Sequence, residues 1–204
     1  MSPSQGEGSG FDSRLPLIKH MTQEQKFTPE QEAKKEAWLE ELANFIVEAN
    51  GQTWAADGAE VDPERPGYKE LEYRKGDWRL RDSYTGYFRA PGMTTVYYKD
   101  MPAWTMAYGG HGQTEGFEER TKETFSFLRR ALKLVSSDLP FRGPELYEED
   151  GKKYTFKLIK GNIEDGLWEE EIVEEGDKTF AQTGIAGVVI HKDFNRQPIY
   201  PWNL

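Results

Sequence analysis

The chain has 204 residues, no cysteine, and 36 acidic against 26 basic residues, which gives a formal net charge of −10. A general binder of the phosphate backbone needs a clustered basic surface, so direct nucleic-acid binding is not expected. Without cysteine, disulfides, thiolate zinc sites and cysteine nucleophiles are excluded. No apolar run approaches the roughly 20 residues of a membrane span, and we expect an acidic, cytoplasmic protein without a membrane partner.

The pattern along the chain predicts one α+β domain over residues 28–192, between a polar N-terminal tail (residues 1–27) and a C-terminal arm (residues 193–204). The first helix begins at a T-x-x-Q capping box formed by Thr28 and Gln31, with Pro29 at the first helical position. An apolar stripe at helical spacing follows, and Asn50-Gly51 is expected to end the helix. The stripe comprises Trp38, Leu42, Phe45 and Ala49.

Residues 68–110 predict an antiparallel β-meander, and its first hairpin is expected to turn at Lys75-Gly76. This loop would pair Leu71 with Leu80 and would place Lys69 opposite Asp82. Apolar residues then meet apolar residues across the strands, and charged residues meet opposite charges.

The second hairpin is expected to join residues 93–99 to residues 103–109 through a three-residue loop of Lys99, Asp100 and Met101. That loop would set Val96 opposite Trp104 and Tyr98 opposite Pro102. Side chains alternate between the two faces of a strand, so one face carries an aromatic and aliphatic set. Its members are Val96, Tyr98, Trp104, Met106 and Tyr108, whereas Thr95, Tyr97, Thr105 and Ala107 lie on the other face.

After a flexible corner at residues 109–112, a second amphipathic helix is predicted over residues 115–136, followed by a stiff loop around Arg142 between two prolines. Four further strands are predicted at residues 154–160, 167–174, 178–183 and 185–191, with turns at Gly161, at Glu175-Gly176 and at Gly184. Helix followed by meander thus occurs twice. The turn contexts EYRKGDW and FKLIKGNI are alike, which suggests a two-lobed internal duplication.

Three side chains are candidates for chemistry, and each has a structural alternative. His111, between glycines, is a candidate base, or else a polar residue in a corner. Asp82, on the apolar side of its strand with Trp78 and Tyr84, is a candidate acid or cation-binding group, or else the ion-pair partner of Lys69. Arg142 is suited to an anionic ligand, or else it ties its loop to Asp138 or to a strand carboxylate.

The aromatic residues offer two locations for a small molecule. Trp104 and Tyr108 belong to the face that is expected to form the core, and a pocket on that side would open at the rim formed by residues 109–112. On the other face, Tyr97 would line a groove together with Arg79 and Arg81. The alternative for Arg79 and Arg81 is a surface charge ladder with the acids of the neighbouring strand.

Three runs, KELEYRKGDWRLRDSYTGYF, VYYKDMPAWTMAYGG and PFRGP, resemble an uncharacterised prokaryotic domain family of unknown function, which occurs alone or behind an XRE-type helix-turn-helix. The resemblance covers residues 38–191 and implies an effector-sensing or interaction role, without catalytic residues to carry over. Residues 1–27 do not match a helix-turn-helix.

From these observations the leading hypothesis is a non-catalytic domain that binds or senses a small molecule. The first alternative is a protein-interaction module that acts as a homodimer, and the second is an enzyme of unrecognised type that uses His111, Asp82 or Arg142. No cofactor and no metal are expected, because the three histidines have no ligand-type spacing.

Overall fold

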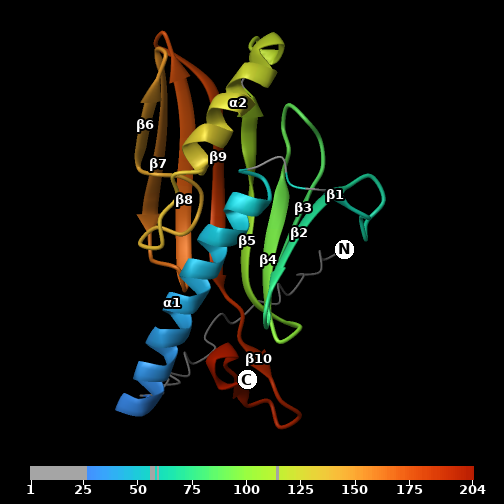
Figure 1. Cartoon of the computed structure of the whole chain (residues 1–204), viewed down its shortest axis with the longest axis vertical. Coiled ribbons are helices and arrows are strands. Elements are labelled where there is room, and N and C mark those ends of the chain that lie inside the picture. Colours follow the sequence, from blue (N-terminus) through green and yellow to red (C-terminus); the bar gives the residue numbers. More distant parts are fainter. Residues whose placement is uncertain (1–26, 56–57, 59, 114) are drawn as a thin grey trace, which may run out of the picture.

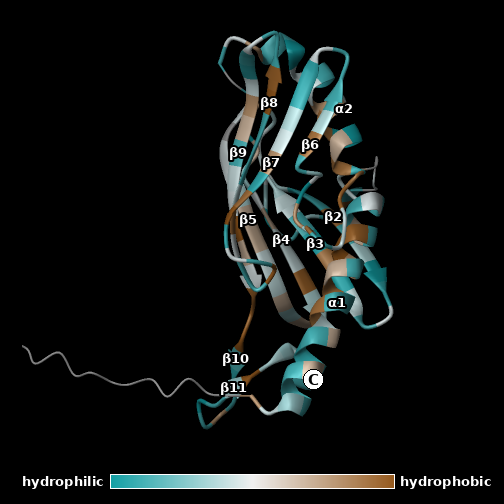
Figure 2. Cartoon of the chain, turned by 90° about the vertical axis from the view of Figure 1, so that its left-hand side faces the viewer, coloured by the Kyte–Doolittle hydropathy of each residue, from teal (hydrophilic) through white to brown (hydrophobic). Residues whose placement is uncertain are grey.

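The computed structural model describes residues 27–55, 58, 60–113 and 115–204, with His111 described by its backbone alone. Within this part of the chain, nine strands form one antiparallel sheet of order β1-β2-β3-β4-β5-β9-β8-β7-β6. Helices α1 (Pro29–Gln52) and α2 (Thr121–Leu132) both lie on one face of this sheet (Figures 1 and 2). We call this the inner face and the opposite one the outer face. The predicted α+β class with antiparallel meanders is confirmed.

Two meanders build the sheet and meet where β5 pairs with β9. The first comprises β1 (Glu60–Val61), β2 (Lys69–Lys75), β3 (Trp78–Tyr84), β4 (Gly92–Tyr98) and β5 (Met101–Gln113). The second comprises β6 (Leu146–Glu149), β7 (Lys152–Lys160), β8 (Asp165–Glu174) and β9 (Asp177–Val188). Of the two similar turn contexts, Gly76 lies between β2 and β3 and Gly161 between β7 and β8, and this similarity of position does not establish a repeat. An internal duplication therefore stays a prediction.

Helix α1 confirms the predicted capping box. The Gln31 backbone N–H donates to Thr28 Oγ1, and the Thr28 N–H donates back to the Gln31 side chain at 2.8 Å. The helix runs two residues past Asn50, because the Thr53 hydroxyl donates to the carbonyl of Ala49 at 2.8 Å and satisfies its last turn. The buried side of the helix packs on β2 and β3, with the rings of Trp38 and Trp78 5.4 Å apart.

The predicted register of the first hairpin is wrong. Lys75 pairs with Trp78, so the two-residue loop consists of Gly76 and Asp77. Gly76 has φ +58 at the first loop position, a conformation that glycine adopts without steric cost. The loop lies one residue further along the chain than predicted, so β2 gains Lys75 and β3 begins at Trp78. Every side chain keeps its predicted face but receives a new partner. Asp82 consequently stands opposite Leu71 instead of Lys69.

The second hairpin has the expected pair of Val96 with Trp104 but not the expected loop. Lys99 and Asp100 form a two-residue loop, with φ of 49° and 62°, and positive φ at both positions is characteristic of a type I′ turn. Tyr98 therefore faces Met101 instead of Pro102. A β-bulge between Val96 and Tyr97 then restores the pairing that a three-residue loop would have given.

Two predicted interruptions are absent from the described strands. β5 continues through residues 109–112, where a bulge against β9 replaces the expected corner. β9 continues through Gly184, where a Cβ atom would lie 2.3 Å from Cζ2 of Trp168. Glycine at this position permits the close approach of an indole ring, not a turn. The second helix is shorter than predicted, since a 3-10 turn (η1, Glu118–Arg120) precedes α2.

At the C-terminus, β10 (His191–Lys192) pairs with β11 (Pro198–Ile199), and a 3-10 turn follows (η2, Pro201–Asn203). Trp202 is buried against Trp38, with ring centroids 5.9 Å apart. Of the predicted N-terminal tail, only Phe27 lies within the described residues, and its ring contacts Tyr200 at 5.1 Å. No helix in the described ranges is long and apolar enough to cross a membrane.

Candidate ligand-binding cavity

A cavity of about 340 Å³ lies between the inner face of the sheet and α2. Strands β2, β3, β5 and β9 contribute to its lining, together with α2, Trp54 after α1 and the loop that carries Arg142. Its volume is at the lower end of the range of small-molecule sites, roughly 300–1,000 Å³.

Asp82 projects from β3 into this cavity and is 2% exposed. Its Oδ1 accepts a hydrogen bond from the Thr94 hydroxyl at 2.7 Å, and the Tyr108 hydroxyl donates to both carboxyl oxygens at 3.1 and 3.0 Å. Burial raises the pKa of Asp82, while these two hydrogen bonds oppose the rise because they favour the ionised form. Burial and the neighbouring Asp82 also raise the pKa of Tyr108. The pair is therefore a carboxyl group and a neutral phenol.

Arg142 forms a buried ion pair with Glu170 of β8. Its Nε donates a hydrogen bond to Oε1 of Glu170 at 3.0 Å, and Nη2 forms an ion-pair contact with the same oxygen at 3.0 Å. The two side chains are 8% and 0% exposed. Glu170 also accepts hydrogen bonds from Gln182 at 2.5 Å and from the Tyr154 hydroxyl at 2.7 Å. Burial disfavours the charged guanidinium, but the attraction of Glu170 outweighs it and raises the pKa of Arg142. The buried carboxylate of Glu170 is thus held by Arg142, Tyr154 and Gln182.

Aromatic and aliphatic side chains form the rest of the wall. The indole of Trp54 lies 4.1 Å from the guanidinium carbon of Arg142, and the ring of Tyr108 lies 5.5 Å from it on another side. Phe125 of α2 meets Phe180 of β9 edge to face, with centroids 6.1 Å apart. The remaining apolar lining comes from Leu71, Tyr84, Phe88, Ala90, Leu128 and Leu132.

Of the candidate residues, the fold brings Asp82, Tyr108 and Arg142 together around the cavity. Asp82 is not the ion-pair partner of Lys69, which instead bonds Glu60 at 2.9 Å. The expectation that a strand carboxylate tethers Arg142 is confirmed by Glu170. Trp104 is fully buried core, and its Nε1 donates to the carbonyl of Ile163 at 2.9 Å. The side chain of His111 lies outside the described residues.

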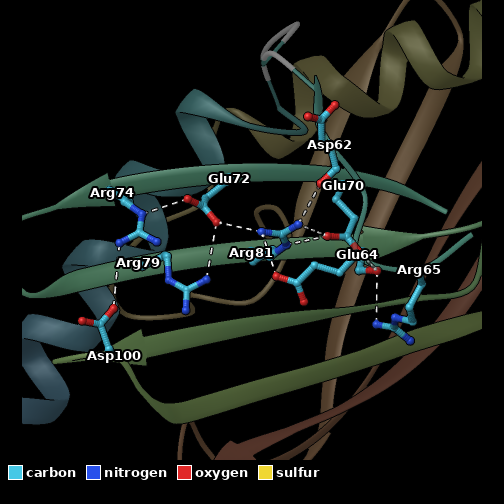
Figure 3. A network of polar contacts seen from close by, with 10 residues as sticks. Asp62, Glu64, Arg65, Glu70, Glu72, Arg74, Arg79, Arg81 and Asp100 are labelled. Atoms are coloured by element: carbon cyan, nitrogen blue, oxygen red, sulfur yellow. Dashed lines mark hydrogen bonds and ion pairs between the residues drawn. The ribbon is translucent and has the colours of Figure 1, made fainter.

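Tyr97, Arg79 and Arg81 lie on the outer face, away from this cavity. The two arginines form a charge ladder with Glu70 and Glu72 of β2 (Figure 3). The guanidinium of Arg79 stacks on Tyr97 at 3.6 Å and bonds Glu72 at 3.4 Å. Arg81 lies between Glu70 and Glu72 and also bonds the carbonyl of Asp62 at 3.0 Å. Burial of Glu70 opposes its ionisation, but the hydrogen bonds from Arg81 and Ser83 outweigh burial and lower its pKa. These ion pairs favour the structural alternative for Arg79 and Arg81.

Sequence reasoning missed several members of the buried network, namely Trp54, Thr94, Tyr154, Glu170 and Gln182. A signal was present in the alternation of β8, where Trp168, Glu170 and Ile172 all point inward. An acid between two large apolar residues of one strand face needs a buried partner. The partner came from a loop 28 residues earlier, which strand alternation alone does not reveal.

Metal binding has no support in the described ranges, where no group of three or more His, Asp or Glu side chains is arranged to hold an ion. The polar groups of the cavity are instead suited to hydrogen bonding and to charge recognition.

The fold and the cavity define a mixed α and β domain with a cavity of polar and apolar residues between a helix and an antiparallel sheet. Residues 82–189, more than half of the chain, match the family described as Domain of unknown function (DUF5680), and the chain belongs to this family. The matched region begins at Asp82 and includes the named partners Thr94, Tyr108, Arg142, Tyr154, Glu170 and Gln182. Neither the curated proteins nor the solved structures include a match.

Proposed function

We propose that this domain binds a small organic molecule in the cavity beneath α2, and that it does so without catalysis. The observation that carries the proposal is the convergence of Asp82, Tyr108 and Arg142 from three separate segments on one cavity of about 340 Å³. A mostly apolar cavity with a few convergent polar groups is the usual form of a ligand site.

Binding without reaction is favoured by the way the polar groups are held. The Nε and Nη2 atoms of Arg142 both contact Glu170, and the guanidinium lies over the ring of Trp54. Arg142 therefore acts as a wall of the site whose position is fixed. The resemblance to domains found behind helix-turn-helix regulators supports a sensing role, in which ligand occupancy is reported to a partner.

A thermal-shift screen with aromatic and amphipathic metabolites tests this proposal. A ligand present at 100 times its Kd stabilises a protein by about 2.7 kcal/mol, so true ligands give clear shifts of Tm. The blocking variant is Ala90→Trp, which places an indole in the lining, and the matched control is Ala107→Trp on the exposed outer side of β5.

Compounds that bind in the cavity are expected to raise the Tm of the wild type and of Ala107→Trp, but not that of Ala90→Trp. The proposal is wrong if no compound in the screen stabilises the wild type. It is equally wrong if Ala90→Trp responds to every hit as strongly as the control does.

We propose a second copy of the chain as the alternative partner, because an apolar row crosses the outer face. Met93 pairs with Ala107, Ala107 with Ile185, and Ile185 with Leu167, so the row spans β4, β5, β9 and β8. Met93, Leu167 and Ile185 are 39%, 38% and 62% exposed. Large exposed apolar patches are typical of protein interfaces.

A twofold axis parallel to the strands would lay the apolar row of one copy on the apolar row of the other. Light scattering is expected to give a dimer mass that Ile185→Glu lowers and Thr183→Glu does not. A monomer mass at all concentrations of the wild type rules out this alternative.

A further inference from the structure

The charge balance inside the cavity points to the class of ligand. The guanidinium of Arg142 is neutralised by Glu170, which accepts a hydrogen bond from Nε and forms an ion-pair contact with Nη2. Asp82 receives hydrogen bonds from two hydroxyl groups, those of Thr94 and Tyr108. Among the described residues, no ammonium or guanidinium group forms an ion pair with Asp82. The buried polar groups therefore carry one carboxyl more than they carry cations.

The carboxyl of Asp82 also retains the capacity to accept further hydrogen bonds. A carboxylate offers about four lone-pair sites. Thr94 bonds Oδ1 alone, and the single proton of the Tyr108 hydroxyl is shared between the two oxygens. Oδ2 thus accepts half of one hydrogen bond, and at least one site remains for a donor that enters the cavity.

A buried carboxylate without a cation costs free energy, and the cost is offset when a cation with hydrogen-bond donors is supplied. Burial raises the pKa of Asp82, as expected for a group that lacks such a partner. The rings of Tyr84, Phe88 and Phe125 line the same cavity. Aromatic faces attract cations and also accept an apolar body.

Two other charged groups line the cavity. Glu60 adds negative charge, although it is paired with Lys69 at 2.9 Å. Arg129 of α2 has the opposite sign and is engaged in contacts of its own.

We infer that the cavity takes an organic ammonium ion, in which a primary or secondary amine donates a hydrogen bond to Asp82 and an aromatic or branched apolar body packs against the ring-lined wall. This inference rests on the proposed function, since it names the ligand class of the same site. A quaternary ammonium ion lacks the N–H donor and is expected to bind more weakly than the matched secondary amine.

Matched triplets of small aromatic compounds test the inference by calorimetry and thermal shift. Each triplet shares one body, such as phenyl, naphthyl or diphenylmethyl, and carries a two-carbon chain ending in an amine, an alcohol or a carboxylate. For at least one body, the amine is expected to bind the wild type at least tenfold more tightly than the alcohol, and the carboxylate least tightly.

Asp82→Asn keeps the size of the side chain but removes its charge, and it is expected to lower the amine-to-alcohol preference to about one. The matched control is Glu60→Gln, which removes the other acid of the lining and is expected to retain the preference. The comparison of amine with alcohol on the wild type alone decides the question if Asp82→Asn does not fold.

The possible failures are distinguishable. If alcohols or carboxylates bind as tightly as amines and Ala90→Trp blocks them, the ammonium inference is wrong and the proposed function stands. If Asp82→Asn folds and keeps the amine preference, the role of Asp82 is wrong. If no member of any triplet and no screened compound binds the wild type, both proposals fail.

Discussion

Replacing Glu170 with glutamine is expected to destabilise the protein strongly, because it breaks the buried pair with Arg142 without changing side-chain volume. Glu170 is fully buried and accepts three hydrogen bonds, one of them from Nε of Arg142, and Nη2 of Arg142 contacts the same carboxylate at 3.0 Å. Glutamine retains one oxygen acceptor, but it turns an amide donor toward Tyr154 or Gln182. The variant therefore leaves a buried guanidinium without an opposing charge and at least one donor without an acceptor.

The magnitude follows from two independent estimates. Two unit charges about 4 Å apart attract by about 4 kcal/mol at an effective dielectric constant near 20. Removing one partner of a buried pair typically costs about 3–5 kcal/mol. For a chain of this size, each kcal/mol corresponds to roughly 2–4 °C in Tm, so the expected loss is on the order of 10 °C.

Urea unfolding monitored by tryptophan fluorescence measures the change in the free energy of unfolding. The matched control is Glu169→Gln, the adjacent acid on β8, whose side chain is half exposed and lies 3.9 Å from Lys157. Exposed pairs contribute about 0–1 kcal/mol, so the control should lose no more than that. A loss below about 1 kcal/mol for Glu170→Gln would refute the view that this pair holds the cavity wall.

Three further changes have expected outcomes that stability measurements can check. Because burial raises the pKa of Asp82, its contribution to stability is fully present below about pH 4 and is lost as the pH rises through the folded-state pKa. The wild type should therefore lose stability relative to Asp82→Asn as the pH rises above about 4; a constant difference in urea titrations would contradict this. Gly184→Ala should lower the free energy of unfolding by about 1–3 kcal/mol, because its Cβ would meet the indole of Trp168. Gly51→Ala, at a helical position with open space, should raise it by about 0.5–1 kcal/mol. Equal Tm values for the two variants would contradict the packing argument. Thr28→Ala should lower the free energy of unfolding by about 1 kcal/mol, because it removes the capping box, and Thr28→Ser is the control that keeps the capping box.

The sequence predicted which face each side chain of the first meander occupies, but not its partner across the strands. Leu80 and Asp82 lie on the inner face as expected, although the hairpin loop lies one residue further along than Lys75-Gly76. Moving the loop by one residue shifts each partner by two, and two residues is the period of a strand. The predicted face of each side chain is therefore still correct, whereas the predicted ion pair of Asp82 with Lys69 is wrong.

Glycine was the least reliable guide to the second half of the chain. Gly184 was expected to form a turn, but it lies within β9 under the ring of Trp168. Gly110 and Gly112 belong to a bulged strand instead of a corner. A glycine permits a turn, a bulge or a close contact equally well, and the choice among them is made by a residue distant in the sequence.

The register error also decides how Asp82 is interpreted. With Lys69 opposite, the carboxyl would be half of an ordinary cross-strand ion pair near the end of a strand, and it would need nothing else. With Leu71 opposite and Thr94 on the other side, it is a buried acid held by hydroxyl groups. Glu170 shows how the same fold treats an inward acid of a strand when an arginine is available, since Arg142 neutralises it completely. The contrast between these two acids, one with a guanidinium and one without, is the physical reason to expect the missing cation of Asp82 to arrive with a ligand.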